Sequence, residues 1–151
     1  LSHMKRQGVT VRNLADIGTG TGLLGFAGLH LWPTARAIAS DIDAVCGPVV
    51  TENAANNGIP LGDGVGRMAM VIAAGVDHPL LQAAGPYDLL IANILARPLI
   101  ALAGDITRAL APGGALDELE RSFRIADDVV RHKLLRLPDA EAARRGITVA
   151  A

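Results

Sequence analysis

The chain has 151 residues, of which 50% are hydrophobic and 19% are charged, so wholesale disorder is excluded and one domain of ordinary size is expected. Its 14 Lys and Arg against 15 Asp and Glu leave a net charge of -1, which argues against binding nucleic acid or a membrane surface through bulk charge. The lone cysteine, Cys46, cannot form a disulfide within the chain, so we expect a reducing, cytoplasmic setting. The longest apolar stretch, 89–103, is interrupted by polar residues and is too short to span a membrane.

Short apolar runs alternate with helical patterns over the first 114 residues. The pattern predicts strands at 11–17, 35–40, 68–73 and 87–92 and helices at 21–31, 44–57 and 98–110. Strands that alternate with helices predict a doubly wound, mainly parallel α/β sheet. In such a sheet a ligand binds at the carboxyl ends of the strands.

The pattern changes after the turn signal Pro112-Gly113-Gly114. Residues 115–151 hold nearly half of the charged side chains in a quarter of the length. Apolar residues recur there at spacings of three and four, which predicts an amphipathic helix: Leu116, Leu119, Phe123, Ala126, Val130, Leu134 and Leu137. We therefore predict two parts, a cofactor-binding core at 1–114 and a charged, mainly helical segment at 115–151.

The sharpest motif is the glycine-rich run Asp16-Ile17-Gly18-Thr19-Gly20-Thr21-Gly22, placed where a strand passes into a helix. Glycines let the backbone approach a ligand closely, and the helix N-terminus adds free N–H groups and a partial positive charge. Asp41 ends the next predicted strand, where a carboxylate can accept two hydrogen bonds from a ribose diol. Together these features predict a nucleotide-like site.

Two nucleotide classes remain open at this point. The run from Gly20 to Gly25 also satisfies the G-x-G-x-x-G pattern of NAD-binding oxidoreductases. Two features count against NAD: Gly18 and Thr19 would fall where the strand should still be apolar, and Asp16 would stand beside a pyrophosphate of like charge. S-adenosylmethionine has no phosphate and carries a sulfonium and an ammonium group, so Asp16 would then be favourable.

The motifs resemble those of a family. Residues 16–22 resemble the first motif of class I S-adenosylmethionine methyltransferases, and 39–43 resembles their second-strand signature. The stretch Asp88-Leu89-Leu90-Ile91-Ala92-Asn93-Ile94-Leu95-Ala96-Arg97-Pro98-Leu99-Ile100 is the most specific. With Glu52-Asn53-Ala54, Asn57-Gly58 and Pro112-Gly113-Gly114, it is similar to the bacterial methyltransferases that modify the eleventh protein of the large ribosomal subunit. The resemblance covers about residues 11–114.

The resemblance implies a Rossmann-like, seven-stranded α/β fold and methyl transfer to lysine side chains and an N-terminal amine of a ribosomal protein. It implies that the glycine loop contacts the methionine end of the cofactor, that Asp41 holds the ribose, and that Asn93 lies beside the transferring methyl group. The cofactor-binding residues expected in this way are Asp16, Gly18, Thr19, Gly20, Gly22, Asp41, Ile42 and Asn93, with Asn93 also catalytic.

The chain also departs from the family pattern. The family's upstream Gly-Thr-Gly-x-His segment and its N-terminal substrate-recognition domain have no counterpart, and residues 115–151 cannot be matched. These departures predict a form truncated or rearranged after residue 114. A non-catalytic cofactor-binding fragment is therefore a third interpretation beside the methyltransferase and the oxidoreductase.

Other residues have less distinctive surroundings. Asp63 could bond an adenine amino group, although a surface turn is the preferred interpretation, and Gly75-Val76 could equally form an adenine wall. His78 is expected in a loop, and Cys46 is expected in the core as a small hydrophobe. No metal site is predicted, because the remaining histidines are far apart and lack ligand-like partners: His3, His30 and His132.

Overall fold

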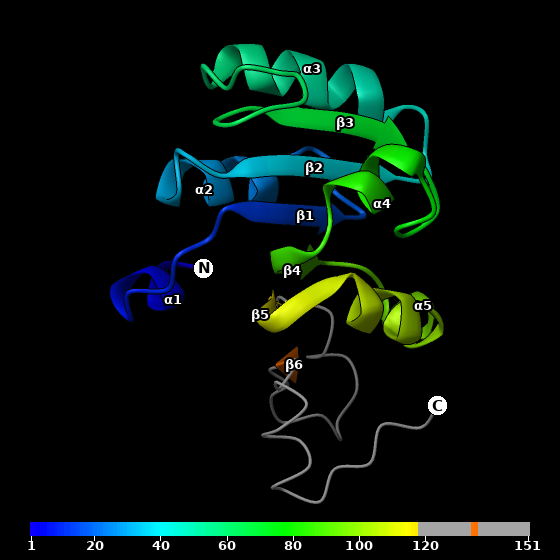
Figure 1. Ribbon diagram of the computed structural model, residues 1–151. Coiled ribbons are helices and arrows are strands. Elements are labelled where there is room, and N and C mark those ends of the chain that lie inside the picture. Colours follow the sequence, from blue (N-terminus) through cyan, green and yellow to red (C-terminus); the bar gives the residue numbers. More distant parts are fainter. Residues whose placement is uncertain (118–133, 136–151) are drawn as a thin grey trace, which may run out of the picture.

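The computed structural model describes residues 1–117 and 134–135 and shows one twisted sheet with helices on both faces (Figure 1). Within the described residues the sheet has six strands in the order β3-β2-β1-β4-β5-β6. Neighbouring strands from β3 to β5 pair in parallel, and β6 is antiparallel to β5. The strands are β1 (Asn13–Ile17), β2 (Arg36–Asp41), β3 (Met68–Ile72), β4 (Tyr87–Ala92), β5 (Leu110–Asp117) and β6 (Leu134–Leu135).

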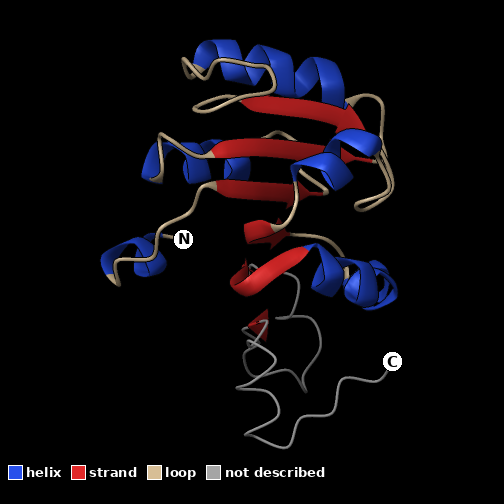
Figure 2. Cartoon of the chain, viewed as in Figure 1, coloured by secondary structure: helices blue, strands red, loops and turns tan. Residues whose placement is uncertain are grey.

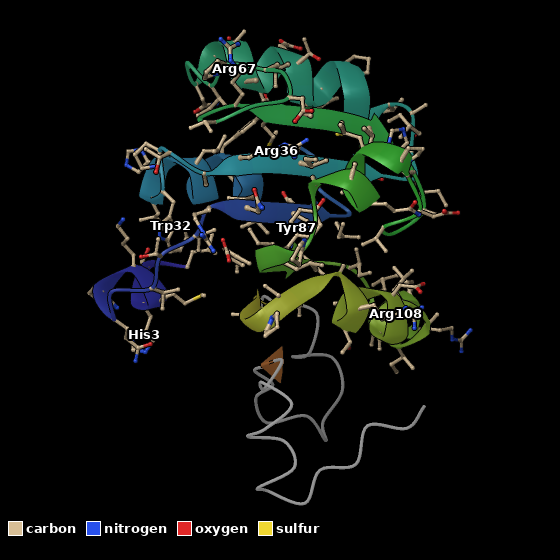
Figure 3. All side chains as sticks on the ribbon, viewed as in Figure 1. His3, Trp32, Arg36, Arg67, Tyr87 and Arg108 are labelled. Carbon is tan, nitrogen blue, oxygen red and sulfur yellow. The ribbon has the colours of Figure 1, made fainter. Side chains whose placement is uncertain are left out.

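The helices form a layer on each face of the sheet (Figure 2). They are α1 (Ser2–Arg6), α2 (Leu23–Leu31), α3 (Cys46–Asn56), α4 (Pro79–Ala84) and α5 (Ala96–Ala109). One apolar core joins the sheet to α1, α2 and α3 and includes Trp32, and the other joins it to α4 and α5 and includes Tyr87 (Figure 3). Because side chains alternate along a strand, Leu14 enters the first core and Ala15 the second.

The predicted fold class is confirmed. The first two predicted strands, 11–17 and 35–40, pair in parallel as β1 and β2, with Asn13 opposite Arg36 and Ile17 opposite Ser40. The strand predicted at 87–92 has the bounds of β4, and the other expected strands and helices agree to within a few residues. Most of the buried strand positions are small or aliphatic, as a sheet covered on both faces favours, and the exceptions are Asp16, Ser40 and Tyr87.

The short helix α4 was not expected. His78 caps it: the ring Nδ1 accepts a hydrogen bond from Leu80 N at 3.1 Å, and Pro79 follows as the first helical residue. With six residues, α4 is too short to show a helical period in the sequence. His78 thus lies where the chain leaves a loop and enters a helix.

The helix expected from Leu116 is wrong where the structure describes it. Strand β5 continues through Pro112-Gly113-Gly114 to Asp117, and Leu116 pairs with Leu134 of β6. The turn residues form an irregularity inside the strand, because pairing moves from Tyr87–Leu110 to Leu89–Ala115. The other expected helix positions, 119–130 and 137, lie outside the described residues, and the division into 1–114 and 115–151 stays a prediction.

No helix in the described part of the chain has both the length and the apolar character that crossing a membrane requires.

Candidate functional site

A pocket of about 760 Å³ opens at the carboxyl ends of the parallel strands, to which the arrows of β2 and β3 point in Figure 1. This volume is typical of a small-molecule site. Its walls come from the segments that follow β1, β2, β3 and β4 and from α5. The lining residues are Ile17, Gly18, Asp41, Ile42, Ala73, Ala74, Gly75, Asn93, Ile94, Leu95, Pro98, Ala101 and Leu102.

The glycine loop after β1 is fastened to the end of β2. The amides of Gly18 and Thr19 both donate to the Ser40 carbonyl, at 2.8 and 3.0 Å. Gly18, Gly20 and Gly22 have φ of +70°, +56° and +84°, a backbone region that other residues adopt only with strain. The path of this loop therefore requires the glycines by itself.

Asp16 lies beneath this loop and not in the pocket lining. The alternation along β1 turns it towards α2, where its side chain is 1% exposed. Its Oδ2 accepts hydrogen bonds from Thr19 Oγ1 at 2.6 Å and from Gly25 N at 2.9 Å. Burial raises the pKa of Asp16 to about 6, against the lowering effect of these two bonds. Asp16 thus holds the loop in place from below.

Asp41 lines the pocket and joins two of its loops. Its Oδ2 accepts a hydrogen bond from Gly20 N at 2.9 Å, and its Oδ1 accepts one from Asp43 N at 3.0 Å. Partial burial acts to raise the pKa of Asp41, but the backbone hydrogen bonds from Asp43 and Gly20 outweigh it and lower the pKa. The carboxylate therefore stays ionised at neutral pH. Ile42 follows it with 77% of its surface exposed.

The β4–α5 turn contributes Asn93, Ile94 and Leu95 to the opposite wall. Asn93 is exposed, and its side chain makes no hydrogen bond to another residue of the described part. Ile94 turns inward and lies against the backbone of Gly18, where an added Cβ would overlap its Cγ2 atom. The turn thus approaches the glycine loop through an apolar contact.

Of the eight expected cofactor-binding residues, the pocket brings together Gly18, Asp41, Ile42 and Asn93. The others belong to the same loop but stand outside the lining: Asp16, Thr19, Gly20 and Gly22. Thr19 is 8% exposed and donates to Asp16. These four support the shape of the loop through its turns and hydrogen bonds, and their direct contact with a cofactor stays a prediction.

Sequence reasoning missed most of the apolar wall. Three of its residues, Pro98, Ala101 and Leu102, come from α5 at spacings of three and four. Such a spacing marks one helix face, but it does not tell whether that face meets a pocket or a core. Of the two residues offered as an adenine wall, Gly75 lines the pocket and Val76 does not. The Ser40 hydroxyl donates to the Gly75 carbonyl at 3.0 Å and holds this wall against β2.

The structure bears on two expectations about single residues, confirming one and correcting the other. Asp63 is an exposed residue in a bend and pairs with Arg36, the first residue of β2. The preferred interpretation as a surface turn is therefore confirmed, and Asp63 stands at the end of the strands opposite to the pocket. Cys46 is half-buried at the start of α3 and belongs to neither core. Desolvation and the nearby Asp41 carboxylate raise the pKa of the Cys46 thiol.

The described residues contain no group of three or more His, Cys, Asp or Glu side chains placed to hold a metal ion, and His132 lies outside them.

The charges of the pocket indicate the class of ligand it fits. Asp41 is the one charged residue among the lining residues that the structure describes, and no Lys or Arg stands with it. A pyrophosphate would meet a carboxylate with no compensating cation, whereas a cationic ligand would be attracted. The apolar walls suit the flat faces of a base, and Asp41 offers acceptors to hydroxyl groups.

Known proteins share sequence patterns with this chain. Residues 1–117 match the family model described as ribosomal protein L11 methyltransferase. A protein of that name from Agrobacterium fabrum is 43% identical over 106 residues, which cover 70% of this chain and 34% of the relative. The chain therefore spans about a third of the length of the curated relatives that it matches.

Solved structures share the fold. A ribosomal protein L11 methylase from Lactobacillus delbrueckii subsp. bulgaricus has a TM-score of 0.60 and 27% identity, and the match covers 78% of this chain and 58% of that one. The N-methyltransferase NodS from Bradyrhizobium japonicum, solved with S-adenosyl-L-homocysteine, has a TM-score of 0.57 and 15% identity, with 78% and 56% covered. The second likeness concerns the fold alone.

Proposed function

Since this chain belongs to the ribosomal protein L11 methyltransferase family, we propose that it binds S-adenosylmethionine and transfers the methyl group to a protein amine. The acceptors proposed are lysine side chains and the N-terminal amine of ribosomal protein L11. The observation that carries the proposal is the pocket in which Gly18, Asp41 and Asn93 meet. The Gly18 backbone, the Asp41 carboxylate and the Asn93 side chain line one cavity, and no cationic side chain stands in its described lining.

In this proposal the polar side of the pocket binds the cofactor. Asp41 accepts hydrogen bonds from the two ribose hydroxyls, and Ile42 covers an apolar face of the nucleoside. The backbone of the loop at Gly18, which lines the pocket, contacts the methionine end of the cofactor. The buried Asp16 contributes negative charge beneath the loop, which favours a cationic ligand.

The cofactor supplies an electrophilic methyl group on sulfur. With the cofactor bound, the amine nitrogen would form a bond to that methyl carbon as the sulfur–carbon bond breaks, and the pair of electrons from the broken bond would go to sulfur. Asn93 can accept a hydrogen bond from the amine through its carbonyl oxygen and hold the nitrogen in line. Orientation of this kind supplies a large share of the rate in such a displacement.

The amine must lose a proton before it can attack, because a lysine of pKa about 10.4 is charged at neutral pH. Among the described lining residues Asp41 alone titrates, and its low pKa makes it a poor base. We therefore propose that the proton passes to solvent before or during binding. The exposed position of Asn93 leaves water access to the amine.

Calorimetric titration tests the cofactor assignment. S-adenosylhomocysteine should bind to the chain and NAD should not. Labelled S-adenosylmethionine should then transfer its methyl group to recombinant ribosomal protein L11. Binding of NAD without binding of S-adenosylhomocysteine would replace the proposal by the oxidoreductase, for which the comparisons offer no support.

A second outcome would support the non-catalytic interpretation. The chain spans about a third of the length of its curated relatives, and cofactor binding and methyl transfer are tested separately. Binding of S-adenosylhomocysteine with no labelled methyl group on any protein of a ribosomal extract would assign a cofactor-binding role alone.

The partner proposed is the ribosomal protein itself, with no direct contact to nucleic acid or to a membrane. The cytoplasm, where ribosomal proteins are synthesised and assembled, is the corresponding location.

A further inference from the structure

The inward-facing side chain of Ile94 connects the β4–α5 turn to the glycine loop. Pairing between β4 and β1 ends at Ala92, opposite Ile17, and α5 begins at Ala96. Between them Asn93 and Leu95 are exposed and Ile94 is half-buried, packed against the core beneath α5. The backbone of this turn is thus anchored by Ile94 within the short gap between two regular elements.

Asn93 depends on that anchor. Its carboxamide has no hydrogen-bond partner among the described residues, so nothing polar within the described chain fixes where it points. Its position is set by the backbone that carries it. A change in how the Ile94 side chain packs against Gly18 would move this backbone relative to the glycine loop, because packed cores transmit small changes in side-chain shape.

The contact partner of Ile94 is Gly18, the residue at which the glycine loop enters the pocket lining. A Cβ on Gly18 would overlap the Cγ2 methyl of Ile94, which therefore lies directly on the glycine backbone. The same methyl group branches from Cβ, so valine retains it and leucine does not. The absence of a side chain at one position and the β-branch at the other are complementary.

We infer that Ile94 is a positioning residue that sets the distance between Asn93 and the glycine loop through its Cγ2 contact with Gly18. The inference deepens the proposed function and rests on it: Ile94 would place Asn93 for methyl transfer without itself touching the amine. It assigns the β-branch of Ile94 a role separate from burial. An isomeric side chain of the same size would bury similar area and lose the role.

The test compares Ile94→Val with Ile94→Leu. Valine should keep the turnover number within about threefold of the wild-type chain. Leucine, although isomeric with isoleucine, should lower it tenfold or more, since a misplacement of about 1 Å can lower a rate by about a hundredfold. The affinity for S-adenosylhomocysteine should change less than turnover in both variants. The side-chain amide resonances of Asn93, identified by their loss in Asn93→Ala, should shift in the leucine variant and stay in place in the valine variant.

A double-mutant cycle isolates the contact itself. Gly18→Ala introduces a left-handed alanine and an overlap, whereas Gly58→Ala introduces the same backbone strain, φ +64° against +70°, into open space. Gly18→Ala should lower the unfolding midpoint more than Gly58→Ala. In the Ile94→Ala background the two glycine substitutions should lower the midpoint equally, because the methyl group that overlaps the new Cβ is then absent.

The outcomes separate this inference from the proposed function. A wild-type chain that does not bind S-adenosylhomocysteine overturns the proposed function. If it binds and the leucine and valine variants are equal in turnover and in the Asn93 resonances, the function stands and the inference is overturned. Additive effects in the cycle would also overturn it, since Ile94 and Gly18 would then not be coupled.

Discussion

The two sides of the pocket are held by different forces. The side built from β1, β2 and the loops that follow them is fastened by directed hydrogen bonds, from Gly18 and Thr19 to the Ser40 carbonyl and from Gly20 to Asp41. The opposite side, after β4 and along α5, contacts its neighbours through apolar side chains. Ile94 lies on Gly18, and a Cβ on Gly75 would stand 2.5 Å from the Cδ2 atom of Leu102.

This difference separates two kinds of control over a ligand. Hydrogen bonds depend steeply on distance and angle, so the polar side offers acceptors in fixed positions. Apolar packing has no preferred direction and is specified by shape. Substitutions on the polar side should therefore change the affinity for the cofactor and the pH dependence of stability. Substitutions on the apolar side should change where the reacting groups are placed.

The largest effect is expected beneath the polar side, at Asp16. Its pKa is raised from 3.8 to about 6 by burial, so the folded protein holds the proton more tightly than the unfolded chain. The stabilising contribution is complete below pH 3.8 and is lost as the pH rises through 6, about 3 kcal/mol in all. Asp16→Asn should remove this loss. The free energy of unfolding in urea, measured at pH 4.5 and 7.5, should fall less with pH in the variant than in the wild-type chain.

An unchanged pH dependence in Asp16→Asn would contradict the assignment. The Asp16 carboxylate would then be accessible to water in the folded protein, and its buried position beneath the loop would be wrong.

Asp41→Ala should weaken cofactor binding by about one to two powers of ten. The change removes an ionised acceptor, and hydrogen bonds to charged groups contribute roughly 1.5–3 kcal/mol. Calorimetry with S-adenosylhomocysteine measures the loss. Asp43→Ala is the matched control, because its carboxylate accepts from Val45 N and lies outside the pocket lining. Equal affinities in the two variants would show that Asp41 only ends its strand.

Asn93→Ala tests the apolar side at its one polar group. Because the role proposed for this carboxamide is at the reacting centre, the substitution should lower turnover about tenfold and change cofactor affinity less. Kinetics with labelled S-adenosylmethionine and ribosomal protein L11 separate the turnover number from KM. A variant that loses cofactor affinity and turnover in equal measure would make Asn93 a binding residue instead.

Ser40→Ala breaks the bond that holds the segment after β3 against the end of β2, from the fully buried hydroxyl to the Gly75 carbonyl. It should lower the free energy of unfolding by about 1 kcal/mol, the net value of a buried hydrogen bond. Thr51→Ala is the control: its hydroxyl donates to Gly47 O at 3.0 Å on an exposed helix surface, where water can replace it. Equal losses in urea denaturation would contradict the structural role of Ser40.

Much of this arrangement could be predicted from the sequence, because it depends on residues that are close together along the chain. Apolar runs and helical spacing indicated strands and helices in alternation, and Tyr87–Ala92 was predicted to the residue. Gly18 and Asn93 directly follow β1 and β4, and Asp41 is the last residue of β2, so a parallel sheet alone brings them to the same end of the strands.

Patterns misled where a distant partner outweighed the local signal. Pro112-Gly113-Gly114 indicated a break, yet pairing with β4 carries β5 across it. Cys46 was predicted in the core from its residue type, but it is only half-buried and lies near Asp41.

By itself, then, the sequence determined the α/β class, the glycine loop and the residues that end each strand, since all of these follow from contacts within a few positions along the chain. The tertiary structure decided that Asp16 lies beneath the loop, that α5 walls the pocket and that Ile94 meets Gly18. These features join residues brought together by the strand order β3-β2-β1-β4. No local pattern encodes that order, because it is selected by the burial of both sheet faces at once.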